Sequence, residues 1–306
     1  MESIAAYLSV VMMLSGFLLI LILQYFIREH YRLKQQRLPF TKRLLRLPGQ
    51  SLLKAIDSIN QEATIWAVTL FIAPVYAYAF YTSSMYFKDQ ATTQAEAVMM
   101  GVILLCFVIY NSYKLAGLLR KRRLLRLGYD GEVAVGQELS QLMREGYHVF
   151  HDFPAGQFNI GHVVVGSKGV FAVETKTRSK PKLGRGREDA TVEYTGRVLH
   201  FPKWTDTHII EQAERQADWL SEWIGGAIGE PVAARAIVAL PGWFVKRTSI
   251  DGIPVVSPKQ FQSLFEHIKP RALSEETIRR IVHQLDQRCR DADPLSSVHA
   301  SEDTHD

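Results

Sequence analysis

The sequence has very little cysteine: Cys106 lies inside an apolar run and Cys289 lies near the C-terminus of the 306 residues. Two cysteines cannot build a disulfide framework or a cysteine-based zinc site. A chain so poor in cysteine fits a reducing compartment. The N-terminus also lacks the basic segment and the small-residue cleavage site of a secretory signal peptide. We therefore expect the first apolar run to remain in the protein as an anchor.

Long apolar runs are confined to residues 1–120, and they contain almost no ionisable side chains. Because about 20 apolar residues span a bilayer, three stretches predict transmembrane helices, at about 4–27, 63–82 and 95–118. The third has the shortest purely apolar core, and Lys114 would have to extend to the interface, so a buried or interfacial helix is the alternative. The lack of charge within the runs argues against a transporter or channel, which needs a polar path.

The net charge of +5 comes from local basic segments, and two of them, 28–54 and 120–126, flank the apolar runs. The loop at 83–94 carries little charge. Basic loops stay in the cytoplasm, so three spans predict an inner-membrane, multi-pass protein with its N-terminus outside and its C-terminal domain in the cytoplasm. The lipid bilayer is then a partner. Anionic headgroups or nucleic acid are further candidates for contact with the basic segments.

Residues 128–290 have the composition of a soluble domain, and residues 291–306 form a polar, acidic tail that we expect to be disordered. Tyr129-Asp-Gly precedes a helical pattern from Glu132 to Arg144. Three strands, a basic excursion, an amphipathic helix and a further strand follow. This order predicts one α/β domain with a mixed central sheet flanked by helices.

Residues 159–176 predict an antiparallel hairpin, because two β-branched and aromatic runs flank Ser167-Lys168 and two glycines. If Gly166 pairs with Gly169, position 161 lies opposite Glu174 and Asn159 lies opposite Lys176. Alternation along a strand puts Glu174 and Lys176 on one face. A carboxylate and an ammonium then point at one small volume, as a metal-dependent phosphodiesterase requires. An exposed cross-strand charge pattern is the alternative.

Several segments together resemble the NERD (nuclease-related) domain, a branch of the PD-(D/E)xK restriction-endonuclease-like superfamily. They are Gly131-Glu132 with Val135 and Leu139, Tyr147 to Phe153, Asn159 to Gly166, Gly169 to Lys176, Gln212-Ala213, and Ile237 to Trp243. The resemblance covers roughly residues 128–267. It implies a restriction-endonuclease-like fold and hydrolysis of nucleic acid with Mg²⁺ or Mn²⁺, with DNA favoured over RNA. Protein partners cannot be inferred from it.

The resemblance also implies roles for particular residues. Glu174 becomes the main metal ligand, and Lys176 positions or activates the water and stabilises the transition state. Glu132 supplies a further carboxylate to the metal or its surroundings, and Gln212 bonds the water or the phosphate. Each has a simpler alternative: Glu132 favours a helix N-terminus through the macrodipole, and Gln212 is a solvent-facing helix residue.

The chain departs from the family pattern at Gly161-His162, where the family has Asp followed by His. The alternative function is therefore a catalytically inactive NERD domain that binds nucleic acid or a protein partner at the membrane. Candidates to replace the missing carboxylate are Asp152 and Asp130, with Asn159 as a neutral oxygen donor. We expect His162 to lie on the face away from Glu174, and we expect no zinc site.

A basic loop leaves the predicted site directly after Lys176. Fork-shaped guanidinium groups suit phosphate contacts, so this loop is the expected nucleic-acid-binding segment, and a solvated loop is the alternative. Its candidate residues are Arg178, Lys180, Lys182, Arg185 and Arg187.

Overall fold

The computed structural model describes residues 43–87 and 94–291, together with residues 22, 25 and 26. The predicted first span, 4–27, lies almost wholly outside the described residues. So does the predicted acidic tail from residue 291 onward. The structure therefore bears on the second and third predicted spans and on the α/β domain.

The chain divides into two compact units. One contains residues 1–39 and 57–123, and the other contains residues 40–56 and 124–306. The second unit holds the α/β domain. It also includes a segment, 40–56, that the sequence analysis assigned to the basic loop between two membrane spans.

The first unit contains most of two long helices, α2 (Gln50–Phe87) and α3 (Gln94–Gln141). By length and composition, Gln50–Ser83 and Gln94–Glu145 are helical stretches apolar enough to cross a membrane. Large apolar side chains on both helices are exposed, such as Phe71 at 79% and Tyr113 at 77%. The two helices contact each other through the rings of Trp66 and Tyr110.

The helix expected to begin at Glu132 is instead the last part of α3, which continues without a break into the 3₁₀ helix η1 (Leu142–Glu145). Tyr129-Asp-Gly is therefore not a turn. Gly131 is needed for packing: a Cβ atom there would lie 1.7 Å from Oγ1 of Thr177. Glycine at this position lets the chain that leaves the sheet approach the helix closely.

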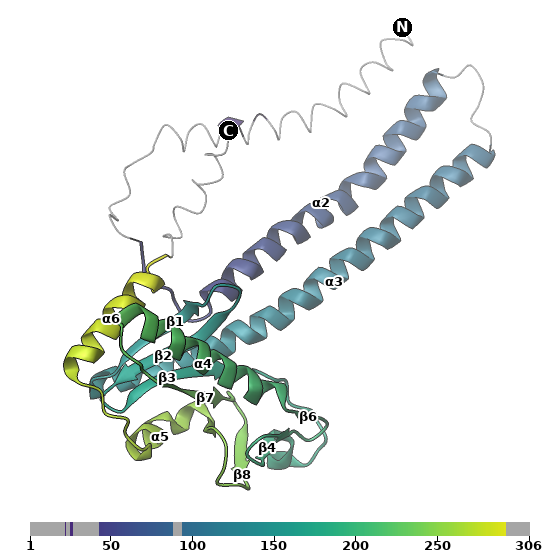
Figure 1. The fold of residues 1–306 in the computed structure, drawn as a ribbon. Coiled ribbons are helices and arrows are strands. Elements are labelled where there is room, and N and C mark those ends of the chain that lie inside the picture. The colour runs from purple at the N-terminus through teal and green to yellow at the C-terminus, as the bar shows by residue number, and fades with distance from the viewer. Residues whose placement is uncertain (1–21, 23–24, 27–42, 88–93, 292–306) are drawn as a thin grey trace. The chain divides into compact units, whose positions relative to one another are not determined.

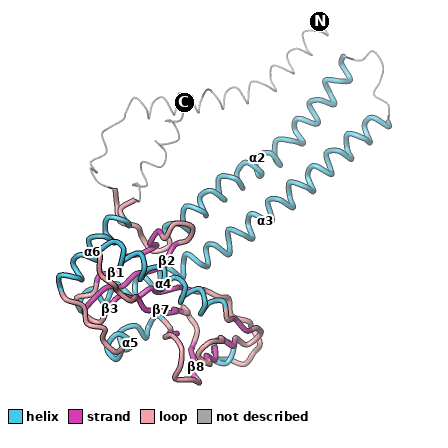
Figure 2. Tube along the Cα trace, viewed as in Figure 1, coloured by secondary structure: helices cyan, strands magenta, loops and turns pink. Residues whose placement is uncertain are grey.

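The larger sheet has the strand order β1-β2-β3-β7-β9, and Figures 1 and 2 label the first four of these strands. Its first three strands are antiparallel, whereas β3, β7 and β9 are parallel. The β2–β3 hairpin has the predicted register, with Gly166 paired to Gly169. This mixed sheet confirms the predicted α/β class. The strands are β1 (His148–Pro154), β2 (Asn159–Gly166), β3 (Gly169–Thr175), β7 (Ala234–Ala239) and β9 (Val255–Val256).

Helices cover both faces of this sheet (Figure 1). On one face α4 (His208–Ile228) and α6 (Glu275–Cys289) bury a core that includes Ala172 and Val238. On the other face the end of α3 and α5 (Phe261–His267), which follows η3 (Pro258–Gln260), pack against Phe171 and Val173. The strands are buried on both sides, which explains their nearly continuous apolar sequences.

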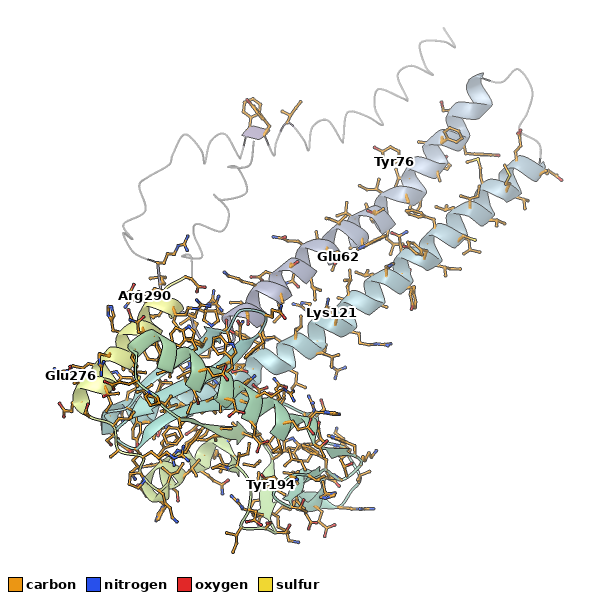
Figure 3. The ribbon with its side chains drawn as sticks, in the orientation of Figure 1. Glu62, Tyr76, Lys121, Tyr194, Glu276 and Arg290 are labelled. Atoms are coloured by element: carbon orange, nitrogen blue, oxygen red, sulfur yellow. The ribbon has the colours of Figure 1, made fainter. Side chains whose placement is uncertain are left out.

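A second, smaller sheet with the order β6-β5-β4-β8 forms from the excursion after β3 and the chain after β7. Strands β4 and β5 form a hairpin around Thr195-Gly196. Tyr194, labelled in Figure 3, is fully buried beneath it and donates a hydrogen bond to the carbonyl of Gly196. The elements are η2 (Gly186–Ala190), β4 (Thr191–Tyr194), β5 (Leu199–His200), β6 (Thr205–Asp206) and β8 (Phe244–Arg247).

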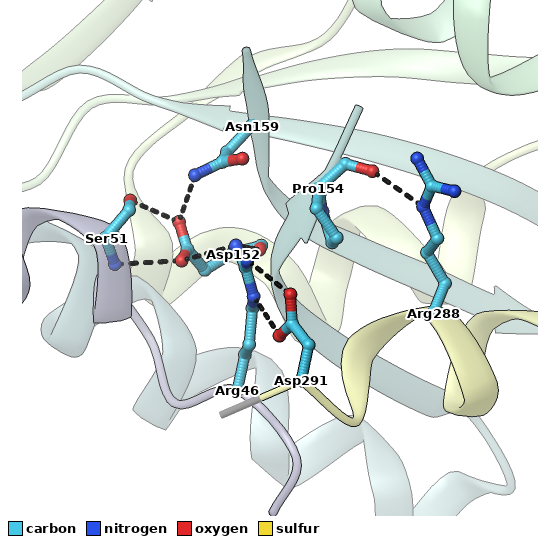
Figure 4. A network of polar contacts seen from close by, with 7 residues as sticks. All are labelled: Arg46, Ser51, Asp152, Pro154, Asn159, Arg288 and Asp291. Carbon is cyan, nitrogen blue, oxygen red and sulfur yellow. Dashed lines mark hydrogen bonds and ion pairs between the residues drawn. The ribbon is translucent and has the colours of Figure 1, made fainter. Parts of the chain in front are cut away.

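An ion-pair cluster ties segment 40–56 to the α/β domain (Figure 4). The guanidinium of Arg46 makes a bidentate contact with Asp291 at 2.6 Å and also donates to the carbonyl and carboxylate of Asp152 at 2.9 and 3.2 Å. Ser51 donates to Asp152 from its backbone and its hydroxyl, at 2.9 and 2.6 Å. Asp152 is buried and has a left-handed backbone, with φ of 49°. We call this cluster the Arg46 clamp.

The Arg46 clamp should contribute measurably to stability. Arg46→Ala leaves the buried Asp152 without its cation, so we expect a loss of about 3 kcal/mol in the free energy of unfolding. The measurement is urea unfolding of the full chain in detergent, followed by tryptophan fluorescence. Lys246→Ala is the control, because the exposed Lys246–Glu193 pair should contribute little to stability. Equal losses in the two variants would contradict the prediction.

Candidate active site where two strands diverge

A pocket of about 500 Å³ opens at the end of the hairpin, within the second unit. The β2–β3 ladder stops at the pair His162–Val173, one residue before Gly161 and Glu174. Beyond this point β2 remains paired only with β1, up to Pro154 and Asn159. The divergence of the two strands creates the pocket. Five of the predicted catalytic and loop residues line it: Glu132, Glu174, Lys176, Arg178 and Gln212.

Glu174 is the centre of the polar contacts in the pocket. Its Oε1 atom accepts a hydrogen bond from Nε2 of Gln212 at 2.9 Å and lies 2.7 Å from the Lys176 ammonium. The predicted sharing of one face by Glu174 and Lys176 is therefore observed, and the exposed-charge alternative is wrong, since Glu174 is only 6% exposed. Gln212 likewise points at the site and not into solvent.

Sequence reasoning missed Gln216, which lies one helical turn after Gln212 on α4. Gln216 is buried, and it lowers the pKa of the Glu174 carboxyl. The signal was present in the sequence: an amide side chain occupies a position in the apolar stripe of an amphipathic helix, between Ala213 and Leu220. A buried polar residue in such a stripe indicates a polar partner.

Burial raises the pKa of Glu174 above its ordinary value, against the opposing charge of Lys176 and hydrogen bonds from Lys176 and Gln216. Glu132 adds to the increase in pKa through like-charge repulsion. Lys176 alone thus does not balance the buried negative charge. A buried carboxylate whose negative charge is only partly balanced would stabilise a further cation beside it.

Glu132 occupies the space that a side chain at position 161 would need. A Cβ atom built on Gly161 would lie 3.0 and 3.1 Å from the two carboxylate oxygens of Glu132, and 3.2 Å from the carbonyl of Val173. The end of α3 therefore brings a carboxylate to the place where the family pattern has Asp on the strand. The N-terminal-helix alternative for Glu132 is wrong, because Glu132 lies deep within α3.

A pair of histidines supports Glu132 from the face opposite Glu174. Nε2 of the fully buried His162 lies 2.9 Å from Oε2 of Glu132, without the alignment of a hydrogen bond. On its other side, Nδ1 of His162 lies 2.8 Å from Nδ1 of His151. Burial and the neighbouring His162 lower the pKa of His151 to about 3, so its ring is neutral near pH 7. His162 is placed, as predicted, on the face away from Glu174.

The other candidates to replace a carboxylate at 161 have different surroundings. Asp130 forms an exposed ion pair with Arg126 on α3 and does not line the pocket. Asp152 does line it, but its two oxygens accept bonds from Ser51, Arg46 and Asn159. Burial raises the pKa of Asp152, against the hydrogen bonds from Ser51 and the charge of Arg46. Asp152 therefore has a structural role, because its hydrogen bonds link the segments that form this wall of the pocket.

Of the five predicted nucleic-acid-binding residues, Arg178 lines the pocket and the other four lie outside it. Arg178 lies 3.7 Å from Asp206, and Lys180 lies beside Gly242. Arg187 stacks over the ring of Phe244 at 4.2 Å. Lys182 and Arg185 are exposed on the loop between them.

The donors in the pocket suit a hard divalent cation. Three buried side-chain oxygens on its wall have no hydrogen-bond partner among the described residues: Oε2 of Glu132 and the hydroxyls of Thr175 and Thr177. Within residues 43–87 and 94–291 no group of three or more His, Cys, Asp and Glu side chains converges on a common point. Two carboxylates, waters and a substrate phosphate can nevertheless complete the shell of Mg²⁺.

The raised pKa of Glu174 predicts how stability depends on pH. The folded state binds the Glu174 proton more tightly than the unfolded state does. The free energy of unfolding therefore falls as pH rises from the pKa of this carboxyl in the unfolded state through its higher pKa in the folded state. Glu174→Gln removes the effect. We expect unfolding in EDTA, measured between mildly acidic and mildly alkaline pH, to show the variant gaining stability relative to wild type as pH rises. Parallel pH profiles would contradict this.

The comparisons with known proteins agree with the site. Residues 127–241 match the family model of NERD, the nuclease-related domain. Comparisons with the curated proteins and with the solved structures give no match. The matched segment contains all the predicted site residues, from Glu132 on α3 to Gln212 on α4. The resemblance expected from the sequence is confirmed over this segment, and residues 127–241 of the chain form a nuclease-related domain.

Proposed function

We propose that the protein is a membrane-anchored, divalent-metal-dependent nuclease whose catalytic domain faces the cytoplasm. The observation that carries the proposal is the convergence of Glu174, Lys176, Glu132 and Gln212 on one pocket. The four come from β3, the residue after β3, α3 and α4. Polar and charged groups from separate elements rarely gather at a buried point without a ligand, because each loses hydration there.

Glu174 and Glu132 are the proposed ligands of Mg²⁺ or Mn²⁺. When bound, such an ion neutralises the phosphate and lowers the pKa of a water molecule. The ammonium of Lys176, fixed by Glu174 at 2.7 Å, stabilises the negative charge that develops on the phosphate. Gln212 uses its amide nitrogen on Glu174, so its amide oxygen is the atom that accepts a hydrogen bond from the attacking water and orients it.

The membrane part of the proposal has three spans, at about 4–27, 63–82 and 95–118, followed by the nuclease domain at 128–290 and the tail at 291–306. Support for the second and third spans comes from the length and the exposed apolar side chains of α2 and α3. The basic segments on either side of them favour a cytoplasmic nuclease domain. Segment 40–56 belongs to the same compact unit as the domain, as a cytoplasmic loop would.

The alternative function is a catalytically silent domain that binds nucleic acid or a protein partner at the membrane. Gly161 favours it, because the family pattern has Asp there. The position of Glu132 favours the enzyme, because its carboxylate fills the space next to Gly161.

Cleavage of DNA and RNA by the full chain in detergent tests the two functions. We expect cleavage with Mg²⁺ or Mn²⁺, none in EDTA, and none with Glu174→Ala. Lys176→Ala should lower the rate roughly a hundred- to a thousand-fold, as expected for loss of one charge-stabilising donor. Glu276→Ala (Figure 3) and Lys259→Ala, exposed and outside the pocket, are the controls. Binding without cleavage would support the silent domain.

A charge-relocation series tests whether Glu132 takes the role of the family Asp. Gly161→Asp alone should lower the cleavage rate, because it forces a second carboxylate against Glu132. Glu132→Ala alone should also lower it, whereas the double variant should recover part of the rate. The measurement is the initial rate at fixed Mg²⁺ concentration. A gain of activity in Gly161→Asp alone would instead identify a silent site that lacks only this carboxylate.

A further inference from the structure

The smaller sheet carries an aromatic ring in an unusual setting. Phe244, the first residue of β8, is 45% exposed, and the guanidinium of Arg187 lies 4.2 Å from its ring centroid. β8 pairs in parallel with β4, so Phe244 lies beside Thr191, directly after η2, which contains Arg187. A planar cation and a half-exposed ring together form a stacking surface. By itself, such a pair only covers the ring. The charges of the neighbouring residues therefore decide whether the pair can bind a ligand.

The surroundings of this pair are strongly basic. Residues 176–190 contain six Lys or Arg and two acidic residues, Glu188 and Asp189. Asp189 accepts hydrogen bonds from the backbone of Leu183 and Gly184, so it shapes the loop. Glu193 is paired with Lys246 on β8. Lys176 is paired with Glu174 and Arg178 lies near Asp206, so the excess positive charge of the loop comes from Lys180, Lys182, Arg185 and Arg187.

The stacking surface is connected to the pocket by a continuous series of contacts. Arg178 lines the pocket, and its carbonyl accepts a hydrogen bond from Nε1 of Trp243 at 3.2 Å. The ammonium nitrogen of Lys180 lies 3.6 Å from the position that a Cβ atom on Gly242 would occupy. Arg187 then covers Phe244. The basic loop thus follows residues 242–244 from the pocket outward, and we call Arg178, Lys180, Arg187 and Phe244 the stacking strip.

We infer that the stacking strip binds single-stranded nucleic acid and leads it to the pocket. Arg178 and Lys180 hold the phosphates, and one unpaired base stacks on the outer face of the Arg187 guanidinium, which the Phe244 ring supports from the other side. Aromatic and Arg platforms beside a basic groove recognise single strands because every base has an exposed π-face once it is unpaired. In a duplex the bases stack on one another, so the pair of Arg187 and Phe244 has no base to bind. The inference rests on the proposed function for the reaction at the end of the strip.

Anionic lipid is the other polyanion that a basic, partly apolar surface could meet. The ring of Phe244 is covered by a guanidinium, and Arg247 is held by the carbonyls of residues 249–252. Neither residue is arranged to enter a bilayer. The observations favour a flat, stackable partner.

Binding by the full chain in neutral detergent with EDTA tests the inference without requiring cleavage. The probes are a fluorescent oligothymidine and a fluorescent duplex of equal length, at the same salt concentration. Phe244→Leu keeps the apolar bulk but removes the π-face, and it should weaken single-strand binding roughly ten- to a hundred-fold while leaving duplex binding unchanged. Ile250→Ala, at a 97% exposed apolar residue of the same region, is the matched control and should change neither.

Arg187→Gln provides an independent test if Phe244→Leu fails to fold. It should weaken single-strand binding, because the side chain loses the planar cation that lies over the Phe244 ring. Unchanged single-strand binding in both variants, or equal losses for single strand and duplex, would overturn the inference. So would displacement of the oligonucleotide by vesicles containing phosphatidylserine but not by unlabelled oligothymidine.

The outcomes also separate this inference from the proposed function. Duplex binding and metal-dependent cleavage without single-strand binding would overturn the stacking strip and leave the nuclease intact. Absence of binding to either nucleic acid would overturn both.

Discussion

The structure around the site depends on a buried carboxylate at the point where two strands separate. Glu174 is held by Lys176 and by Gln212 of α4, yet burial still raises its pKa. The backbone of β3 can place it there because β7 pairs with the other edge of β3 up to Thr175 and Ala239. Strand β3 is thus still paired with β7 on one edge where its pairing with β2 on the other edge has ended. The charged side chain of Glu174 is thus kept in a low-dielectric environment. A residue with a purely structural role would not need a charge there.

The walls of the pocket come from parts of the chain that are distant in sequence. Segment 40–56 contributes Gly49, Ser51 and Leu52, although the family domain begins only at residue 127. The Arg46 clamp fixes this segment to Asp152 and to Asp291 after α6. The nuclease-related domain is therefore completed by residues on both sides of it. A fragment that starts at the family boundary would lack part of the pocket wall and the cation that faces Asp152.

The departure from the family pattern at Gly161 has a structural counterpart in α3. Because Gly161 has no side chain, the Glu132 carboxylate reaches the end of β2, and the His162–His151 pair supports it from behind. Gly131, the residue before Glu132, has a similar effect, because the absence of a side chain there lets Thr177 approach the helix. The two glycines together allow the helix and the strands to approach closely. A carboxylate supplied by a helix thus lies beside the strand position that has no side chain.

Local patterns in the sequence were sufficient for the mixed α/β class, the hairpin register and the shared face of Glu174 and Lys176, because strand alternation and turn glycines act over a few residues. Helix α3 was wrongly divided at Tyr129-Asp-Gly, since a glycine selected for packing against Thr177 resembles one selected for a turn. The buried Gln216, the position of Glu132 beside Gly161, the Arg46 clamp and the contact of Arg187 with Phe244 were decided only by the tertiary structure. Each joins residues from separate elements, and such contacts depend on how helices and sheets pack, which no local periodicity encodes.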